Sequence, residues 1–149
     1  MDAFLASLHH LAAFALVGLL IAELVLLGGR LDRDGLRRFG RVDMLYGAAA
    51  GIVIAAGIAR LAFGPVPADV YFSNAFFWLK MGAFAAVAAI SAYPTVMGVR
   101  WRLALRRDPS FEVGVADVRR LRRALYAELA VLPLIPVSAA LMARGIGAL

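Results

Sequence analysis

The sequence AFLASLHHLAAFALVGLLIAELVLL at residues 3–27 decides the fold, because it is apolar over almost its whole length. Glu23 is its one acidic residue, and it contains no lysine or arginine. A helix needs about 20 consecutive apolar residues to cross the hydrocarbon core of a bilayer, and this stretch is long enough. No basic residue precedes it and it is longer than the apolar part of a signal peptide. We therefore expect it to stay in the protein as a membrane-spanning helix.

Three further stretches have the same character, at residues 43–63, 75–99 and 124–143. Their continuous runs of alanine and leucine favour helices over the alternating strands of a membrane barrel. Of the 149 residues, 63% are hydrophobic and 17% are charged, and the mean hydropathy of +0.83 is too high for a water-soluble protein. We predict an all-α integral membrane four-helix bundle, surrounded by the lipid bilayer, that forms a single transmembrane domain over residues 1–149.

A faint internal repeat divides the chain into two halves. Tyr46 and Tyr126 lie near the starts of the second and fourth spans, and Arg60 and Arg144 lie near the ends of the same spans. This pattern favours two tandem helical hairpins that are related by an axis along the membrane normal.

Basic residues are concentrated in two of the three connections between the spans. Residues 30–41 contain five arginines and residues 100–123 contain eight, whereas residues 61–74 contain no lysine or arginine. Connections rich in arginine are typically cytoplasmic, so we expect a multi-pass protein of the bacterial inner membrane with both termini in the periplasm. The same distribution explains the net charge of +6 without a nucleic-acid partner.

Smaller features predict how the spans pack and where they meet water. Apolar residues recur at helical spacing over 118–125, which predicts a basic helix at the membrane surface leading into the fourth span. Trp78 and Trp101 lie near opposite ends of the third span, which is typical of tryptophans in the membrane interface. Gly47 and Gly51 are a pair of small residues four apart, so we expect a close helix contact there.

Ionisable side chains are costly inside a membrane, and each therefore needs a partner or a function. At about 1.5 Å per residue, His9 and Lys80 lie roughly 9 Å below the periplasmic ends of their spans, with His10 next to His9. Arg60 and Arg144 lie at the periplasmic rim. We predict that these five residues form a basic cluster.

A second set of ionisable residues lies toward the cytoplasmic ends of the spans. Glu23 and Glu128 lie roughly 6 Å from the ends of the first and fourth spans, and Asp43 and Tyr46 are in the first turn of the second span. We predict that these four residues form an acidic cluster, as a proton relay or as structural polar groups. His9 and Glu23 are about four helical turns apart and share one face, which indicates that His9 points into the bundle.

These residues belong to motifs that resemble a family of bacterial four-span membrane proteins catalogued as a domain of unknown function. The resemblance covers nearly the whole chain and brings no established activity. The motifs are LHHLAAF at 8–14 with Glu23, YG at 46–47, GIAR at 57–60, FWLKM at 77–81, YPT at 93–95 and MARG at 142–145. More remotely, the layout is similar to the four-helix membrane protoporphyrinogen oxidase and to copper-resistance-type membrane domains.

The resemblance to the oxidase implies bound haem b, with a histidine in the first helix and a lysine in the third. His9 or His10 and Lys80 are the matching positions. An imidazole can bind haem iron, Arg60 and Arg144 would pair with the propionates, and Lys80 would tune the site or act on a substrate. Two adjacent histidines on one helix cannot bind one iron from opposite faces. The haem would therefore be five-coordinate, use an unusual sixth ligand or span a homodimer.

Three hypotheses about function follow. The first is a haem b or porphyrin-binding redox protein, and the sequence leaves open whether it is an enzyme. The second is a non-enzymatic subunit or assembly factor, acting in a homo-oligomer or a larger membrane complex. The third is a small transporter or proton relay that uses Glu23 and Glu128. The chain has no cysteine, which excludes thiol catalysis and thiolate metal sites and argues against copper handling.

Overall fold

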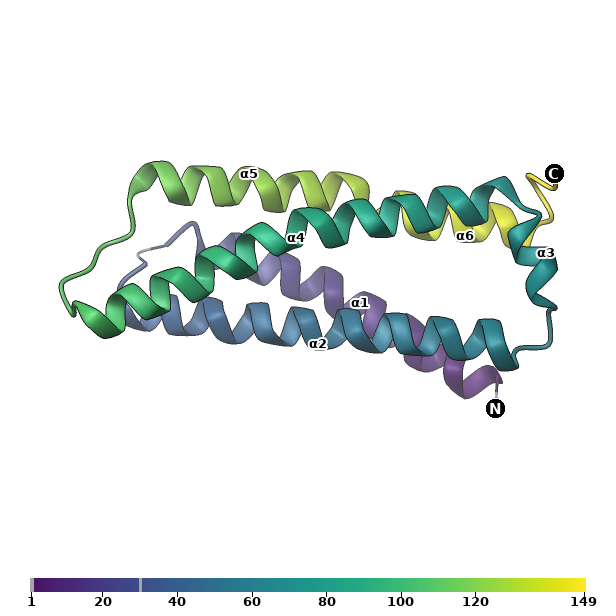
Figure 1. Ribbon diagram of the computed structural model, residues 1–149, viewed down its shortest axis with the longest axis horizontal. Helices are drawn as coiled ribbons and strands as arrows, with labels where there is room; N and C mark the ends of the chain where they lie inside the picture. The colour runs from purple at the N-terminus through teal and green to yellow at the C-terminus, as the bar shows by residue number, and fades with distance from the viewer. Residues whose placement is uncertain (1, 30) are drawn as a thin grey trace.

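The computed structural model describes residues 2–29 and 31–149 and is built from helices joined by short connections (Figure 1). Met1 and Arg30 lie outside the described residues, and Arg30 is one of the five arginines of the first basic connection. The helices of the described ranges are α1 (Asp2–Leu26), α2 (Arg33–Phe63), α3 (Ala68–Phe72), α4 (Ala75–Arg107), α5 (Val115–Val131) and α6 (Leu134–Ala143).

The helices form two hairpins, of α1 with α2 and of α4 with α5 and α6. α5 and α6 together make the fourth span, which is interrupted at Pro133 because proline has no backbone N–H to continue the helix. Four segments are long and apolar enough to cross a membrane: Ala3–Leu26, Arg33–Phe63, Ala75–Arg107 and Val115–Ala143. The prediction of an all-α membrane bundle of two tandem hairpins is confirmed.

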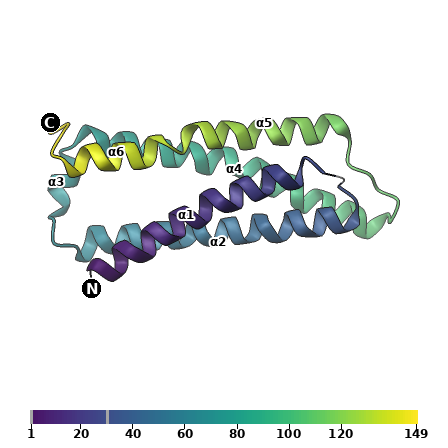
Figure 2. The same ribbon diagram turned by 180° about the vertical axis from the view of Figure 1, so that it is seen from behind.

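The two ends of the bundle differ in composition. α3 and both chain termini lie at one end, which we call the terminal end (Figures 1 and 2). The other end holds the start of α2, the end of α4 and the start of α5, together with residues 27–29 and 31–32 between α1 and α2 and residues 108–114 between α4 and α5, and we call it the arginine-rich end.

The helices extend well beyond the apolar stretches that the sequence shows. α2 begins ten residues before the predicted start at 43, and α4 continues past the predicted end at 99 as far as Arg107. Arginine is a good helix former, and the Asp32 side chain caps α2 by accepting a hydrogen bond of 2.8 Å from the backbone N–H of Gly35. The apolar stretches thus mark the membrane spans and not the helix ends.

The packed core lies at the arginine-rich end and extends toward the middle of the bundle. Its buried members come from α1, α2, α4, α5 and the α1–α2 connection: Leu16, Leu20, Leu27, Leu36, Phe39, Tyr46, Ala49, Trp101, Leu105, Leu121 and Leu125. Trp101 is only 4% exposed and its ring centroid lies 6.4 Å from that of Phe39. The prediction that Trp101 lies in the membrane interface is therefore wrong, because this helix end is packed inside the protein. Trp78 is exposed, and its Nε1 donates a hydrogen bond to the Phe72 carbonyl.

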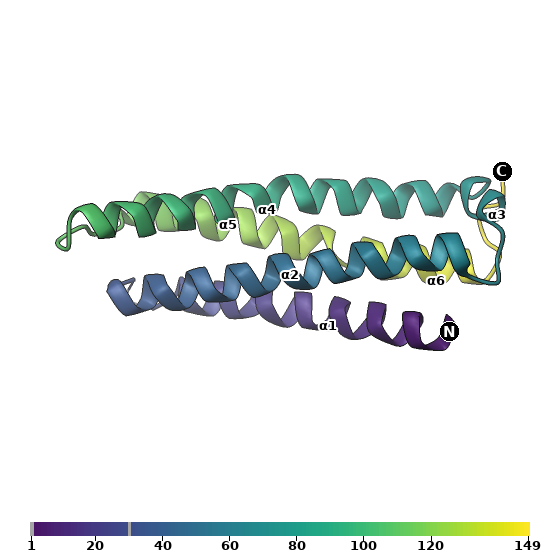
Figure 3. The ribbon, with the colours of Figure 1, turned by 60° about the horizontal axis from the view of Figure 1, so that its bottom comes forward.

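The two hairpins lie apart at the terminal end. There α6 packs against α4, and both are separated from α1 and α2 (Figure 1). Turning the molecule shows α1 and α2 side by side along their length, and the same pairing appears in the reverse view (Figures 2 and 3). The expected close contact at Gly47 and Gly51 is wrong, because a Cβ built on either glycine meets no atom within 4 Å. These glycines face outward, away from α1.

Candidate functional site

Glu23, Asp43, Tyr46 and Glu128 come together inside the bundle, and we call these four residues the acidic cluster. They are contributed by α1, α2 and α5, and each is at most 6% exposed. Glu23 interacts electrostatically with both Asp43 and Glu128. The structure thus brings together the four residues that the sequence places at similar depth.

Two hydrogen bonds tie the acidic cluster across helices. The Tyr46 hydroxyl donates to Oε2 of Glu128 at 2.9 Å, which links α2 to α5. The Thr95 hydroxyl donates to Oδ1 of Asp43 at 2.7 Å, which links α4 to α2. Every long helix except α6 therefore contributes to the cluster or to a bond with it.

Two carboxyl oxygens of the acidic cluster have no hydrogen-bond partner. They are Oε1 of Glu23 and Oε1 of Glu128, and both are fully buried. Placing an unpaired carboxylate in a medium of low dielectric constant costs several kcal/mol or more. Three carboxylates this close and this buried cannot all carry charge unless protons or cations neutralise them.

The acidic cluster consists of carboxyl and phenol groups. Across residues 2–29 and 31–149, no three histidine or carboxylate side chains are arranged to hold a metal. Carboxyl and phenol groups instead exchange protons, and each protonated oxygen becomes a hydrogen-bond donor. Intramembrane carboxyl groups of this kind are typical of proton pathways.

The predicted basic residues gather only in part. Nδ1 of His9 lies 3.0 Å from the Val53 carbonyl, so the ring points toward α2, and the charges of Arg60 and Lys80 reach it. Nζ of Lys80 also lies 5.2 Å above the ring of Phe77, a cation–π contact. His9, Arg60 and Lys80 therefore form a group at the terminal end.

The other two predicted basic residues are exposed, and the His10 ring lies edge-on to that of His9 with 6.0 Å between the ring centroids. His10 is exposed and turned away from the bundle, as expected for the neighbour of an inward-facing residue on a helix. Arg144 is exposed at the end of α6, which packs against α4 and not beside α1. His9 is thus the inward residue of the pair, as the face that it shares with Glu23 predicts.

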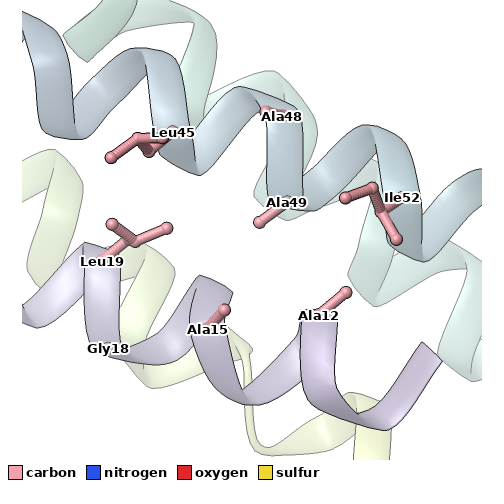
Figure 4. Close-up of a pocket in the computed structure, with 8 residues that line it drawn as sticks. All are labelled: Ala12, Ala15, Gly18, Leu19, Leu45, Ala48, Ala49 and Ile52. Atoms are coloured by element: carbon pink, nitrogen blue, oxygen red, sulfur yellow. The ribbon is translucent and has the colours of Figure 1, made fainter. Parts of the chain in front are cut away.

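A groove on the bundle lies between α1 and α2 and has a volume of about 420 Å³ (Figure 4). Its lining is apolar, and small residues form much of it. The lining residues are Ala12, Ala15, Gly18, Leu19, Leu45, Ala48, Ala49 and Ile52. Because its lining residues are all apolar, the groove can contact hydrocarbon chains but has no side chain that could bind a polar ligand or take part in a reaction.

Sequence reasoning missed two residues next to the acidic cluster. Thr95 bonds Asp43 although Thr95 is exposed, and the sequence marks it only as part of the YPT motif at 93–95, without a role. Arg102 lies against Gly40 across the contact between α2 and α4. Nothing in the sequence indicates that contact, because the two residues are far apart in the chain.

The chain was compared with known proteins. No curated protein and no solved structure matches it. A family model described as "Predicted membrane protein (DUF2214)" matches residues 1–147, which is nearly the whole chain. The four membrane-spanning segments agree with that description. The chain therefore belongs to this family of predicted membrane proteins, whose function is unknown.

Proposed function

We propose that this protein binds protons in its acidic cluster and passes them within the membrane, as a proton relay or as the proton-binding part of a small transporter. The observation that carries the proposal is the pair of buried, unpartnered oxygens, Oε1 of Glu23 and Oε1 of Glu128. A cluster built only to hold the fold would satisfy these atoms, because unpartnered buried oxygens weaken a structure.

Proton binding removes the cost of the buried charge. A proton on Oε1 of Glu23 or Glu128 cancels one buried charge and turns that oxygen into a donor. Tyr46 can follow the change, because its hydroxyl already donates to the other oxygen of Glu128. Asp43 keeps the hydrogen bond from Thr95 throughout. The cluster can thus hold a variable number of protons without rearranging its helices.

The orientation follows from charge. With its arginines in the cytoplasm, as the positive-inside rule indicates, the arginine-rich end faces inward and both termini face the periplasm of a bacterial inner membrane. The acidic cluster then lies on the cytoplasmic side of the membrane centre. The group of His9, Arg60 and Lys80 lies toward the periplasm.

The test is proton flux into liposomes that contain the purified protein and an internal pH-sensitive dye. After the outside is acidified, with potassium and valinomycin clamping the voltage, the wild-type protein should acidify the interior faster than empty liposomes do. Glu23→Gln and Glu128→Gln should each reduce the flux to the empty-liposome level, because glutamine keeps the shape but cannot exchange the proton.

The matched control is Glu112→Gln, since Glu112 is exposed in the connection between α4 and α5. Flux through this variant should equal that of the wild type. Equal flux in all variants, or none above empty liposomes for the wild type, would overturn the proposal. Absence of flux together with co-purification of a larger membrane complex would favour the role of subunit or assembly factor instead.

Haem b binding at the terminal end is the second candidate, and the bond of His9 to Val53 favours it. A histidine that binds a metal usually gives its other ring N–H to a backbone carbonyl, and Nδ1 of His9 is placed for this at 3.0 Å. Nε2 is then left to bind iron. His9 offers one axial ligand and Arg60 lies near it to pair with a propionate, whereas Arg144 lies on the other hairpin. Haem bound there would supply one-electron redox chemistry.

A visible spectrum of the protein purified in mild detergent from haem-replete cells tests this candidate. His9→Ala should abolish a haem band, and His10→Ala should leave it unchanged because His10 faces outward. A colourless wild-type preparation, or a band that survives His9→Ala, would remove it.

A further inference from the structure

Arg102 lies beside the acidic cluster on its arginine-rich side. Asp43 is bonded to Thr95 across α2 and α4. Three residues toward the arginine-rich end, about 4.5 Å along the axis, α2 presents Gly40 and α4 presents Gly98. A Cβ built on Gly40 would lie 3.0 Å from both Cδ and Nε of Arg102. The Arg102 side chain therefore occupies the level directly beyond Asp43.

Two glycines make room for this arrangement. Gly40 on α2 faces Arg102 of α4, and Gly98 on α4 faces Phe39 of α2, where a Cβ would lie 3.1 Å from Cε1 of the ring. Both glycines are buried. Each helix thus places one large side chain over a glycine of the other. These two contacts set the position of α2 along the axis of α4.

The side chain of Arg102 runs back along α4, in the direction of the terminal end. Its Nε donates a hydrogen bond of 3.3 Å to the Gly98 carbonyl, one turn earlier in α4. Because α4 runs from the terminal end to the arginine-rich end, that turn lies on the side of the cluster. Arg102 is half-buried, whereas Arg100, Arg106 and Arg107 of the same helix are exposed.

We propose that Arg102 is the positioning residue of the acidic cluster: its fixed positive charge, held next to the cluster by its packing on Gly40, sets how tightly the cluster holds its protons. This inference rests on the proposed function. An arginine keeps its charge at every pH that proteins tolerate, so it is a permanent counter-charge. The titratable groups of the cluster are Glu23 from α1, Asp43 and Tyr46 from α2 and Glu128 from α5, and Arg102 of α4 packs on Gly40, three residues from Asp43.

Infrared spectroscopy of the protein in nanodiscs tests the inference, because protonated carboxyl groups have their own carbonyl band. The cluster's band is the one that Glu23→Gln or Glu128→Gln removes. Arg102→Gln should raise the pH at which this band is half lost, by roughly one pH unit or more, because a nearby cation favours the ionised carboxylate. Arg102→Lys keeps the positive charge and should therefore shift the titration less than Arg102→Gln does. Arg106→Gln changes an exposed residue of the same helix and should cause no shift.

Gly40→Ala is a second variant that keeps every charge. Its methyl group would displace Arg102 from its place, while alanine favours the helix more than glycine does. We expect a shift in the same direction as for Arg102→Gln, and this variant decides the question if Arg102→Gln does not fold. A band that titrates at the same pH in the wild type and in both variants would overturn the role of Arg102 and leave the proposed function standing. A wild-type protein with no titrating buried band would overturn the proposed function itself.

Discussion

The arginine-rich end and the terminal end of this bundle are held together in different ways. At the arginine-rich end, side chains from four helices interlock, and Leu20, Phe39 and Leu121 are completely buried. At the terminal end the hairpins lie apart, and Ser138 is the one buried side chain of α6 in the structure. Lipid is as apolar as leucine, so helices in a membrane associate by packing and polar contacts and not by the hydrophobic effect.

The difference explains where the acidic cluster lies. Buried carboxyl groups need fixed neighbours, and a tightly packed region provides them. The cluster accordingly adjoins the core, and Tyr46 belongs to both. The terminal end is held instead by hydrogen bonds around Asn74, which join the start of α4 to the C-terminal residues. Four substitutions, each with a matched control, test this contrast.

The largest effect is expected for Phe39→Ala in the core. Phe39 is fully buried against Gly98 and Trp101, so its removal leaves a cavity and should lower the free energy of unfolding by about 3 kcal/mol. The matched change is Phe14→Ala on α1, where the side chain is 75% exposed and the loss should be roughly 0.5 kcal/mol or less. Unfolding by SDS in mixed micelles measures both. Equal losses of unfolding free energy in the two variants would mean that the core at the arginine-rich end does not stabilise the protein as expected.

The next effect is expected for Tyr46→Phe, which removes the hydrogen bond to Glu128 and leaves both oxygens of that buried carboxyl group without a partner. The expected loss is about 2 kcal/mol. Tyr126→Phe is the control, because Tyr126 is 52% exposed and its hydroxyl takes part only in a long contact of 3.4 Å with Arg122. Unfolding by SDS in mixed micelles again measures the free energy of unfolding of both variants. A Tyr46→Phe protein as stable as the control would show that the cluster contributes nothing to the core.

The sequence predicts most of this fold, because continuous apolar stretches have few solutions in lipid. Four spans follow from hydropathy alone, and the two hairpins follow from the repeat of Tyr46 with Arg60 and Tyr126 with Arg144. Trp101 shows where such reasoning stops: its place near the end of a span suggests the interface, but the helices continue and pack around it. Only contacts between helices could reveal that.

The candidate site was predictable to the same extent. Counting residues from the ends of the spans places the four residues of the acidic cluster at one level along the helices. The count predicts neither the bond from Thr95 to Asp43 nor the contact of Arg102 with Gly40. Those depend on the rotation of α4 about its axis, which a nearly uniform apolar sequence does not specify. Arg144 illustrates the same point, since it shares its depth with Arg60 but lies on the other hairpin.

A smaller effect is expected for Asn74→Ala at the terminal end. The Asn74 side chain caps α4 by accepting a hydrogen bond of 2.9 Å from Phe76 N–H, and it donates one of 3.0 Å to the Ile146 carbonyl. Losing the cap should cost about 1 kcal/mol, all of it at this end. Hydrogen exchange should accelerate at residues 144–149 and stay unchanged in the core. Ser73→Ala is the control, because the exposed Ser73 hydroxyl bonds only the nearby Val70 carbonyl.

The smallest effect is expected for Ser110→Ala, outside the membrane at the arginine-rich end. The Ser110 hydroxyl and backbone N–H donate to Oδ1 of Asp108 at 2.6 and 2.9 Å, which lowers the pKa of that carboxyl group below its usual 3.8. Removing the hydroxyl should raise the pKa toward 3.8. Because the folded-state pKa is lowered, the bonds stabilise the protein above the usual pKa, and this is lost as the pH falls through the folded-state value.

The wild type should therefore be slightly more stable than Ser110→Ala at neutral pH and equal to it once Asp108 is protonated. Carbon NMR titration of the Asp108 carboxyl in nanodiscs measures the pKa change directly, and Glu112 in the same connection serves as an unaffected reference. Since Asp108 is fully exposed, water already solvates its carboxylate and the gain in stability is small. An unchanged Asp108 titration would show that the turn at this end is set by the backbone alone, so that side-chain bonds matter more at the terminal end than here.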